Sequence, residues 1–509
     1  MVNRLQRGRL LFAVLVVLLL AGLYGLAGLR HPAHAVGAAT VPPGRAAVTS
    51  AVQACAAPGS GGAISGSLAI AAMPGSATGG SATVTRLTPA GSAAAGPVLA
   101  TASRPGLLQI VGVPTAPAVA KALQAAQPGS SPKVTTEAAR GGVMVTATGA
   151  MAQGLAVEQT DAAGLVTAQC GHPGTSFWFL GPGQATAGNI DLYLMNTSSA
   201  PADAQLTLVT DITKGGPLLG NADSGISVAP HSMVVQSLTS LVQSSKVVAL
   251  HVTTSVGQVV AAVRETSSNS DDGSWLPVSP APASTLVIPG LPSEPGTPEL
   301  YLAVPGSGTA QVKVTAVTSK GSYQPTGGTD IDLLGGTAAE IPLPSLAGVT
   351  GAVSISASSP VEAAMIVSGG AAGTQGALAA AAGPVQEQGV IADSPAGSAG
   401  SADLVLSAPA KAASVEITVG TASLPASGQA GTVVQVGAGS SVVVPIKAPA
   451  GHHSSALLVV VTPQADSGPV YAGWELESGG TLESILAVPS SPTWIPVPPV
   501  QSSIVAGSP

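Results

Sequence analysis

The residues that could carry chemistry are few and lie far apart along the chain. Nucleophilic catalysis needs a serine or cysteine that a neighbouring base activates, and the sequence lacks the G-x-S-x-G turn that exposes such a serine. It also lacks the nucleotide-binding pattern G-x-x-x-x-G-K-[ST]. The histidines are therefore interpreted as ordinary polar or packed side chains: His31, His34, His172, His231, His251, His452 and His453.

Two short stretches contain metal-ligating side chains, and each is more simply a solvated loop. His452 and His453 are adjacent, and adjacent residues of a strand point to opposite faces. Residues 269–273 (Asn-Ser-Asp-Asp-Gly) are similar to part of a calcium loop, but they lack the acidic ligand at its far end. No bound metal and no cofactor are expected.

Aromatic residues make up only 2% of the chain, too few to line a cleft for glycan hydrolysis easily. Carboxylates that recur near the ends of separate expected domains are not expected to meet in one site: Glu158, Glu265, Glu362 and Glu475. A sugar-binding surface needs fewer aromatic residues than a hydrolytic cleft, because one exposed aromatic ring can stack on a sugar. The aromatic residues considered for such binding are Trp178, Trp275 and Trp474.

The chain has two cysteines, Cys55 and Cys170. An even number in an exported protein favours a disulfide, and a bridge that closes so long a loop contributes about 4–5 kcal/mol in the chain-entropy model. The alternative is a pair of buried thiols. Two cysteines alone do not supply the ligands of a tetrahedral zinc site.

The N-terminal region predicts export. Residues 10–29 are uninterrupted apolar or small residues that follow Arg4, Arg7 and Arg9. A run of this length can cross a bilayer as a helix, and the arginines keep the preceding tail in the cytoplasm. The alternative is a signal peptide that is cleaved near Ala35 and releases the chain. In either case the remainder of the chain lies outside the cytoplasm.

Composition limits the class of protein and its partners. Of the 509 residues, only 8% are charged, and the formal net charge is −7. Nucleic acid is excluded as a partner because binding phosphates requires clustered cations, and no such cluster follows Arg30. The hydrophobic fraction of 45% argues against disorder. We expect an aliphatic core built from small side chains.

The exported region is expected to be all-β, with tandem immunoglobulin-like β-sandwich domains after one N-terminal transmembrane helix. Short runs of Val, Ile, Leu and Thr alternate with small polar residues and end at turn residues, which is the pattern of strands. The clearest unit has seven such runs, a number typical of immunoglobulin-like sandwiches. Its strands are expected at Phe177–Leu180, Asp191–Asn196, Gln205–Asp211, Ile226–Val228, Ser232–Leu238, Val247–Ser255 and Val259–Glu265.

Landmarks of this unit recur at the spacing of whole domains rather than of solenoid repeats. A charged residue followed by Leu-x-Leu opens units at Asp191, Glu299 and Asp403. The expected segments are a cytoplasmic tail (1–9), the membrane segment (10–29), a spacer (30–54), four sandwich domains (55–168, 169–280, 281–370 and 401–488), a linker (371–400) and a Pro-rich tail (489–509). The stretches 267–282 and 369–401 are interpreted as connectors.

Several motifs together resemble an uncharacterised family of exported, membrane-anchored proteins of actinomycete-type bacteria. These motifs are Cys170–Phe179, Asp191–Leu194, Pro230–Ser232, Ala261–Arg264 and Trp275–Pro277. The resemblance is firmest over residues 165–280. It implies a secreted or membrane-anchored envelope protein, and it supplies no catalytic residues.

These observations favour a non-enzymatic protein of the cell envelope. The leading hypothesis is an array of sandwiches that holds an envelope protein or a cell-wall polymer through surface complementarity, with an exposed sheet edge as one route. The second hypothesis is a carbohydrate-binding module for wall glycan. The third is an extracellular hydrolase whose site forms between domains.

Overall fold

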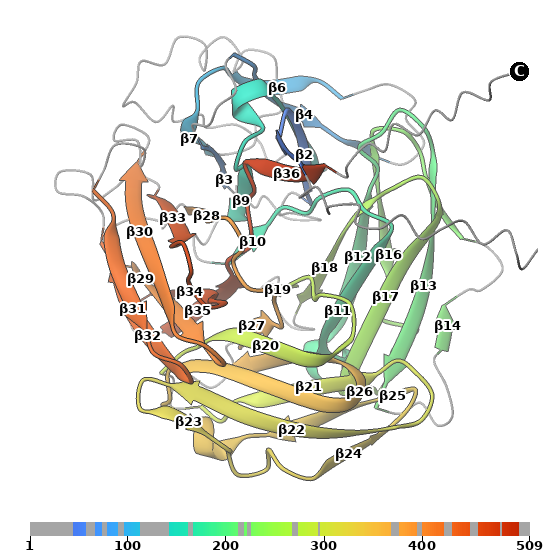
Figure 1. Ribbon diagram of the computed structural model, residues 1–509. Helices are drawn as coiled ribbons and strands as arrows, with labels where there is room; N and C mark the ends of the chain where they lie inside the picture. The colour runs from blue at the N-terminus through green and yellow to red at the C-terminus, as the bar shows by residue number, and fades with distance from the viewer. Residues whose placement is uncertain are drawn as a thin grey trace, which may run out of the picture. The chain divides into compact units, whose positions relative to one another are not determined.

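The chain is nearly all β, as the sequence predicts, and the sheets of the computed structural model in Figure 1 are antiparallel apart from one short parallel pair. The helical turns in the described residues are η1 (Gly149–Met151), α3 (Gln184–Ala187) and η2 (Pro344–Leu346). All seven runs expected in the clearest unit form strands: β11 (Ser176–Pro182), β12 (Asn189–Met195), β13 (Ala202–Thr210), β15 (Ile226–Val228), β16 (Ser232–Ser237), β17 (Val247–Val256) and β18 (Val260–Thr266).

The structure describes residues 44–56, 67–73, 79–89, 96–111, 142–160, 166–211, 218–220, 225–266, 273–293, 296–367, 376–393, 400–421, 430–447, 457–478 and 481–497. The predicted membrane segment (10–29), His31, His34, His452, His453 and residues 269–272 lie outside these ranges. Among the residues inside them, no helix is long and apolar enough to cross a membrane.

The chain divides into two compact units. The smaller one comprises residues 1–46 and 495–509, and its described part is the strand pair β1 (Gly44–Ala47) and β36 (Trp494–Val497). The larger unit, Ala47–Trp494, contains all the other strands. In it, sheets pack face to face around apolar cores, and each such arrangement is called a sandwich below.

Sandwich 1 and sandwich 2 each contain two sheets. In sandwich 1, one sheet consists of β2 (Ser50–Cys55), β8 (Val143–Thr148), β4 (Ala82–Arg86) and β6 (Val98–Ala102). The sheet that packs against it consists of β10 (Thr167–Gln169), β9 (Ala156–Thr160), β3 (Ser67–Ala72) and β7 (Gly106–Val111). In sandwich 2, one sheet consists of β19 (Gly273–Leu276), β18, β12, β16 and β5 (Thr88–Pro89), a short strand from the sandwich 1 region of the chain. The facing sheet consists of β11, β17, β13, β14 (Leu218–Gly220) and β15.

Sandwich 3 and sandwich 4 follow the same plan. The layers of sandwich 3 are joined by the long strand β26 (Gly351–Val367), which pairs with β20 (Ala283–Leu291) and β22 (Thr309–Thr318) along its first half and with β21 (Glu299–Val304) and β27 (Ala377–Ala380) along its second. Its remaining strands are β23 (Gly321–Tyr323), β24 (Ile331–Leu334) and β25 (Thr337–Pro342). In sandwich 4, one sheet consists of β28 (Gly389–Asp393), β33 (Leu457–Pro463), β30 (Ala413–Thr421) and β31 (Thr432–Val436). The facing sheet consists of β32 (Ser440–Ile446), β29 (Gly400–Ala408), β34 (Tyr471–Ser478) and β35 (Thr481–Ala487).

The period-2 alternation of side chains explains how each core forms. In β22, Ala310, Val312, Val314 and Ala316 point into the core of sandwich 3 and are buried. The residues between them in the first half of the strand are exposed, including Lys313. The strand therefore stabilises the fold by burying one apolar face, at about 25 cal/mol for each Å² of apolar surface removed from water.

The outer faces of the sandwiches are also apolar, and they bury one another in a closed cycle (Figure 1). Sandwich 1 contacts sandwich 2 through one cluster, and the core cluster of sandwich 2 continues into sandwich 3. Sandwich 3 contacts sandwich 4, which contacts sandwich 1 in turn. The contacting residues include Ala54 with Tyr193, Tyr301 with the sandwich 2 cluster, Val317 with Tyr471, and Met73 with Val460.

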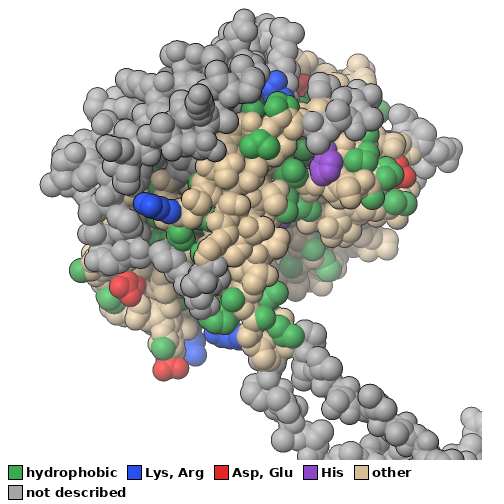
Figure 2. Space-filling view, turned by 90° about the horizontal axis from the view of Figure 1, so that it is seen from above, with side chains coloured by type: hydrophobic (Ala, Val, Ile, Leu, Met, Phe, Trp, Pro, Cys, Tyr) green, Lys and Arg blue, Asp and Glu red, His purple; other side chains and the backbone are tan. Residues whose placement is uncertain are grey.

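The low surface charge agrees with burial of the outer faces between sandwiches. Figure 2 shows only scattered charged side chains among the described residues on the face that it displays. Only 8% of the residues are charged, so there are few charged side chains with which to solvate the outer faces of four sandwiches. The sandwiches were expected to form a chain of modules joined by linkers. The structure instead shows that they share apolar interfaces.

Two of the expected connectors contain paired strands. The stretch 267–282 includes β19, which pairs with β18, and the linker expected at 371–400 includes β27 and β28, which pair with β26 and β33. Both stretches are rich in Gly, Ala, Ser and Pro, which resembles linker composition. Of these strands, β19 and β27 lie at the centre of the cycle, where they approach β10 and β35, and each of the four is at the edge of its sheet.

The interface between sandwich 3 and sandwich 4 includes a close approach of two backbones. A Cβ atom on Gly473 of β34 would overlap the backbone of Gly290 in β20. Gly290 itself has a φ of 80°, a left-handed conformation that favours glycine. The two glycines therefore fix how closely these sandwiches approach.

The variant Gly473→Ala should lower the free energy of unfolding by about 1–3 kcal/mol, because the added methyl group pushes the two backbones apart. Urea denaturation measures this change. The matched control is Gly306→Ala, where nothing lies within 4 Å of the added Cβ atom. Equal stability of the two variants would show that the close approach does not hold the interface together.

Candidate functional site

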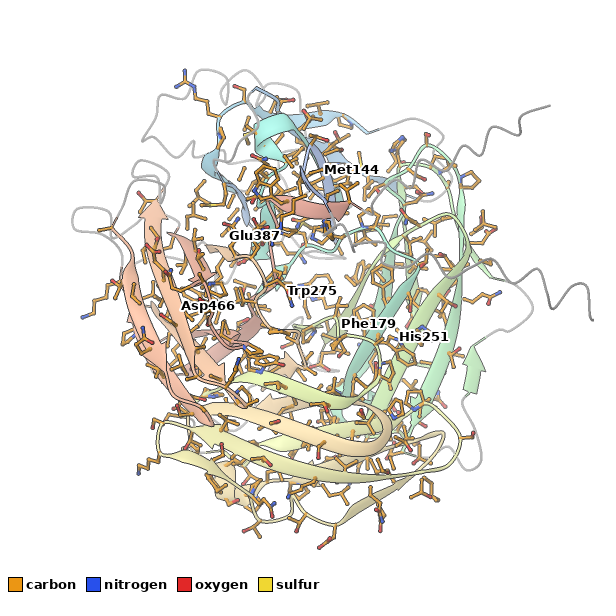
Figure 3. The ribbon with its side chains drawn as sticks, viewed as in Figure 1. Met144, Phe179, His251, Trp275, Glu387 and Asp466 are labelled. Atoms are coloured by element: carbon orange, nitrogen blue, oxygen red, sulfur yellow. A yellow bond between two sulfur atoms is a disulfide. The ribbon has the colours of Figure 1, made fainter. Side chains whose placement is uncertain are left out.

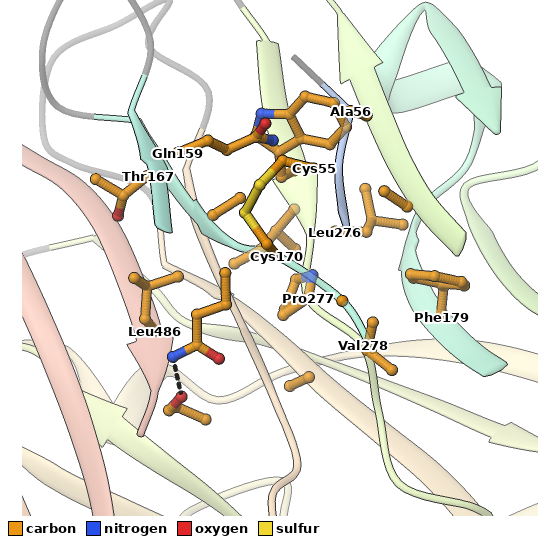
Figure 4. Close-up of a pocket in the computed structure, with 18 of the residues that line it drawn as sticks. Cys55, Ala56, Gln159, Thr167, Cys170, Phe179, Leu276, Pro277, Val278 and Leu486 are labelled. Atoms are coloured by element: carbon orange, nitrogen blue, oxygen red, sulfur yellow. Dashed lines mark hydrogen bonds between the residues drawn. A yellow bond between two sulfur atoms is a disulfide. The ribbon is translucent and has the colours of Figure 1, made fainter. Parts of the chain in front are cut away.

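A cavity of about 410 Å³ lies where the four sandwiches meet. Figure 4 shows it in close-up, with side chains from several strands surrounding one open space. The four central edge strands all contribute to its lining, through Thr167 of β10, Trp275 of β19, Leu378 of β27 and Leu486 of β35. No Asp, Glu, Lys or Arg belongs to the described lining. The wall is mostly apolar, with a small number of polar side chains.

The disulfide between Cys55 and Cys170 forms part of this wall, and the predicted pairing is confirmed. Cys55 ends β2 and Cys170 follows β10, so the bridge joins the two sheets of sandwich 1. Next to it, the backbones of Ala54 and Gly171 exchange two hydrogen bonds of 2.9 and 3.0 Å. The bridge therefore fixes the point at which the chain passes from sandwich 1 into sandwich 2.

His172 lines the cavity next to the disulfide, and its surroundings favour the neutral ring. Desolvation by the surrounding protein lowers the pKa of His172 although part of its side chain is exposed, and a hydrogen bond with the Val52 backbone opposes this shift in part. Its Nε2 lies 3.0 Å from Nε2 of Gln53. The Gln53 amide can only donate from that nitrogen, so His172 Nε2 accepts and carries no proton. At neutral pH the lining therefore carries no net charge.

Polar side chains also link sandwich 1 to sandwich 4 across the cavity. Gln169 donates a hydrogen bond of 3.0 Å from Nε2 to the carbonyl of Ala487, which is the dashed line in Figure 4. The hydroxyls of Thr167 and Ser484 lie 3.2 Å apart. These hydrogen bonds satisfy polar groups inside an otherwise apolar interface. In contrast, Oε1 of Gln159 is buried at the cavity and has no hydrogen-bond partner among the described residues.

The aromatic residues considered for sugar binding have different positions. Trp474 is wholly buried, in the core of sandwich 4, so the expectation that it could stack on a sugar is wrong. Alternation explains this, since Ala472 and Leu476 of the same strand point into that core. Trp275, near the centre of Figure 3, lines the cavity and lies against the Tyr193 ring at a centroid distance of 5.4 Å. Trp178 is half-buried and stacks on His251 at 3.7 Å.

The Trp178–His251 stack adjoins a serine. Ser176 Oγ lies 2.9 Å from His251 Nε2, which is within hydrogen-bond distance, and burial lowers the pKa of His251. Figure 3 shows His251 next to Phe179, its neighbour in sandwich 2. A serine hydrolase also needs a group that orients the histidine. No hydrogen bond from His251 to a carboxylate is found in the described part of the chain.

The four recurrent glutamates lie in different sandwiches. Oε1 of Glu158 accepts a hydrogen bond of 3.2 Å from the backbone of Ala392, which links sandwich 1 to sandwich 4. Glu265, Glu362 and Glu475 are in β18, β26 and β34 and are also buried. Burial raises the pKa of Glu265 to about 8 and that of Glu362 to about 9. Within the described ranges, neither carboxylate oxygen of Glu362 has a hydrogen-bond partner.

Metal ligands do not gather in the part of the chain that is described, where no group of three or more His, Cys, Asp or Glu side chains could hold an ion. The cavity was not predicted from the sequence, because its lining comes from strands far apart in the chain. No motif marks Gln159 or Gln169 as a lining residue. The short apolar stretch Ala377–Ala380 was the one local hint, and it was interpreted as a flexible connector.

The buried carboxyl of Glu362 predicts a pH dependence of stability. The folded state keeps this group protonated up to pH of about 9, whereas the unfolded chain releases the proton near its ordinary pKa. Stability is therefore fully present below the unfolded pKa and falls as pH rises toward 9, by up to about 1.4 kcal/mol for each pH unit. The variant Glu362→Gln removes this loss.

Urea denaturation of the two proteins across pH 4–9 measures the effect. The free energy of unfolding of Glu362→Gln should match that of the wild type near pH 4 and exceed it by a growing margin toward pH 8. A variant that is less stable than the wild type at pH 8 would contradict the assignment of a protonated carboxyl.

The chain matches a family model over residues 123–447, which covers β8 to β32, including all of sandwich 3 and all of sandwich 2 except β5. A search of curated proteins finds no match. The resemblance seen in the sequence, to an uncharacterised family, is thereby confirmed. The model spans well over half of the chain, and the protein belongs to DUF5719, a family of unknown function.

Proposed function

We propose that the protein is a non-enzymatic, exported component of the cell envelope that holds a partner protein through an exposed sheet edge. Three features support export: the apolar run at residues 10–29, the arginines before it, and the disulfide, since disulfides persist in oxidising compartments. Residues 10–29 would anchor the chain in the membrane, with the cleaved, secreted form as the alternative. Each sandwich would be an immunoglobulin-like domain in a tandem array.

The observation that carries the binding proposal is the edge of sandwich 4. Among the described residues, β31 pairs only with β30, and β32 pairs only with β29. Val433 of β31 is 54% exposed and Val443 of β32 is 36% exposed. No charged residue occurs at 430–446. Natural sheets usually protect such edges with charged residues, so an unprotected edge marks a place where another strand is accepted.

The partner that fits this edge is an extended, mainly uncharged segment of an envelope protein. Such a segment would add a strand to β31, with affinity from main-chain hydrogen bonds and selectivity from contacts with the exposed valines. The low charge of the whole protein does not favour a polyanionic partner, because binding one requires clustered cations.

A second candidate function, binding of wall glycan, has one specific observation in its favour. Trp178 of β11 and His251 of β17 stack face to face at an interplanar angle of 6°, and both side chains are half-buried. A sugar ring could stack on the outer face of this aromatic pair. Loss of retention on wall polysaccharide in Trp178→Ala would favour this function over peptide binding.

Site-specific photocrosslinking in intact cells tests the proposed edge. Replacement of Val433 with a photoreactive phenylalanine should give a discrete adduct with an envelope protein, in the membrane fraction after a high-salt wash. The control is the same replacement at Leu334 of β24, which is 67% exposed on sandwich 3. Absence of an adduct at Val433, or the same adducts at both positions, would contradict the proposed edge.

A further inference from the structure

The central cavity has properties that the proposed edge interaction does not use. We propose that it binds one small, uncharged and mainly apolar molecule that carries a hydrogen-bond donor. Its volume of about 410 Å³ lies within the range of about 300–1,000 Å³ that is typical of small-molecule sites. Sites of this kind are also commonly lined by apolar side chains with a small number of placed polar groups, as this one is.

The lining determines the charge of the ligand. None of its described residues is Asp, Glu, Lys or Arg, and the hydrogen bond from Gln53 keeps His172 neutral at Nε2. A charged molecule would lose its hydration here without gaining a partner of opposite charge. An apolar molecule instead gains contact with Phe177, Trp275 and Leu378, which all line the space.

The donor is inferred from Gln159. Its side chain is 4% exposed and belongs to the lining, and its Oε1 atom has no hydrogen-bond partner in the part of the chain that the structure describes. A buried acceptor without a donor destabilises the folded state. A ligand hydroxyl or amine at the cavity wall would supply the missing donor, and this would be the polar contact that orients the molecule.

The cavity also has an accessible side. Four of its lining residues are exposed, namely His172, Ser176, Val278 and Pro489, and Val278 is 47% exposed. Others are almost wholly buried, among them Cys55, Phe179 and Ile485. The exposed residues therefore form the open side of the cavity and the buried residues form its closed side, so a ligand can enter without unfolding of the sandwiches.

Titration with N-phenyl-1-naphthylamine tests the proposal, because this probe is uncharged, aromatic and carries one N–H donor. The full-length chain is held in amphipol, and the signal of empty amphipol is subtracted. We expect saturable binding of one probe per chain. We also expect Ala487→Trp, which fills the cavity at a partly exposed lining position, to abolish the saturable signal.

The donor is tested separately with Gln159→Met, which keeps the length of the side chain and removes the acceptor. The affinity for N-phenyl-1-naphthylamine should fall about fivefold to tenfold, as expected for one lost hydrogen bond. The affinity for 1-benzylnaphthalene, which has CH₂ in place of NH and is measured by displacement of the first probe, should not fall. Gln205→Met on the exposed face of β13 is the matched control and should change neither affinity.

Three results would overturn the proposal. They are the absence of saturable binding to the wild-type protein, unchanged binding by a folded Ala487→Trp variant, and an equal loss of affinity for both probes in Gln159→Met. Because Gln159→Met removes an unsatisfied polar atom, its folding is expected to be preserved. Circular dichroism and the melting temperature confirm this before the titrations.

Discussion

The fold depends on the mutual burial of apolar sheet faces between sandwiches. A sandwich normally buries its inner faces and leaves its outer faces to water, with polar and charged side chains on them. In this chain the outer faces also bear Tyr193, Tyr301, Val317 and Val460, which are buried between neighbouring sandwiches. Because only 8% of the residues are charged, each sandwich needs its neighbours, and the cycle closes when sandwich 4 contacts sandwich 1.

The centre of the cycle follows from the same constraint. Four edge strands approach one another there, and their side chains at the centre range from Ala377 and Ala380 of β27 to Trp275 of β19. These side chains do not fill the space between the strands, and a cavity remains. The disulfide lies at this cavity and joins the two sheets of sandwich 1, and the hydrogen bond from Gln169 to Ala487 links sandwich 1 to sandwich 4. Packing of the outer faces and the presence of a central binding space are therefore two consequences of one arrangement.

Much of the local structure could be predicted from the sequence. Alternating apolar residues identified the strands of sandwich 2, and the pairing of Cys55 with Cys170 was expected from cysteine number and export. The central strands β19 and β27 were missed, because the Gly, Ala, Ser and Pro residues in and around them have the composition of a linker. Trp474 was misjudged, although its alternation with Ala472 and Leu476 already placed it on a core face. The cavity could not be predicted, since Gln159 and Trp275 belong to different sandwiches and no local pattern brings them together.

The most direct test of this account is differential scanning calorimetry of the full-length protein. If the sandwiches depend on one another for burial of their outer faces, residues 47–494 should unfold in one cooperative transition, with equal calorimetric and van't Hoff enthalpies. Several separate transitions, each with the enthalpy of a domain of about 100 residues, would show that the sandwiches are independent modules and would contradict the closed cycle.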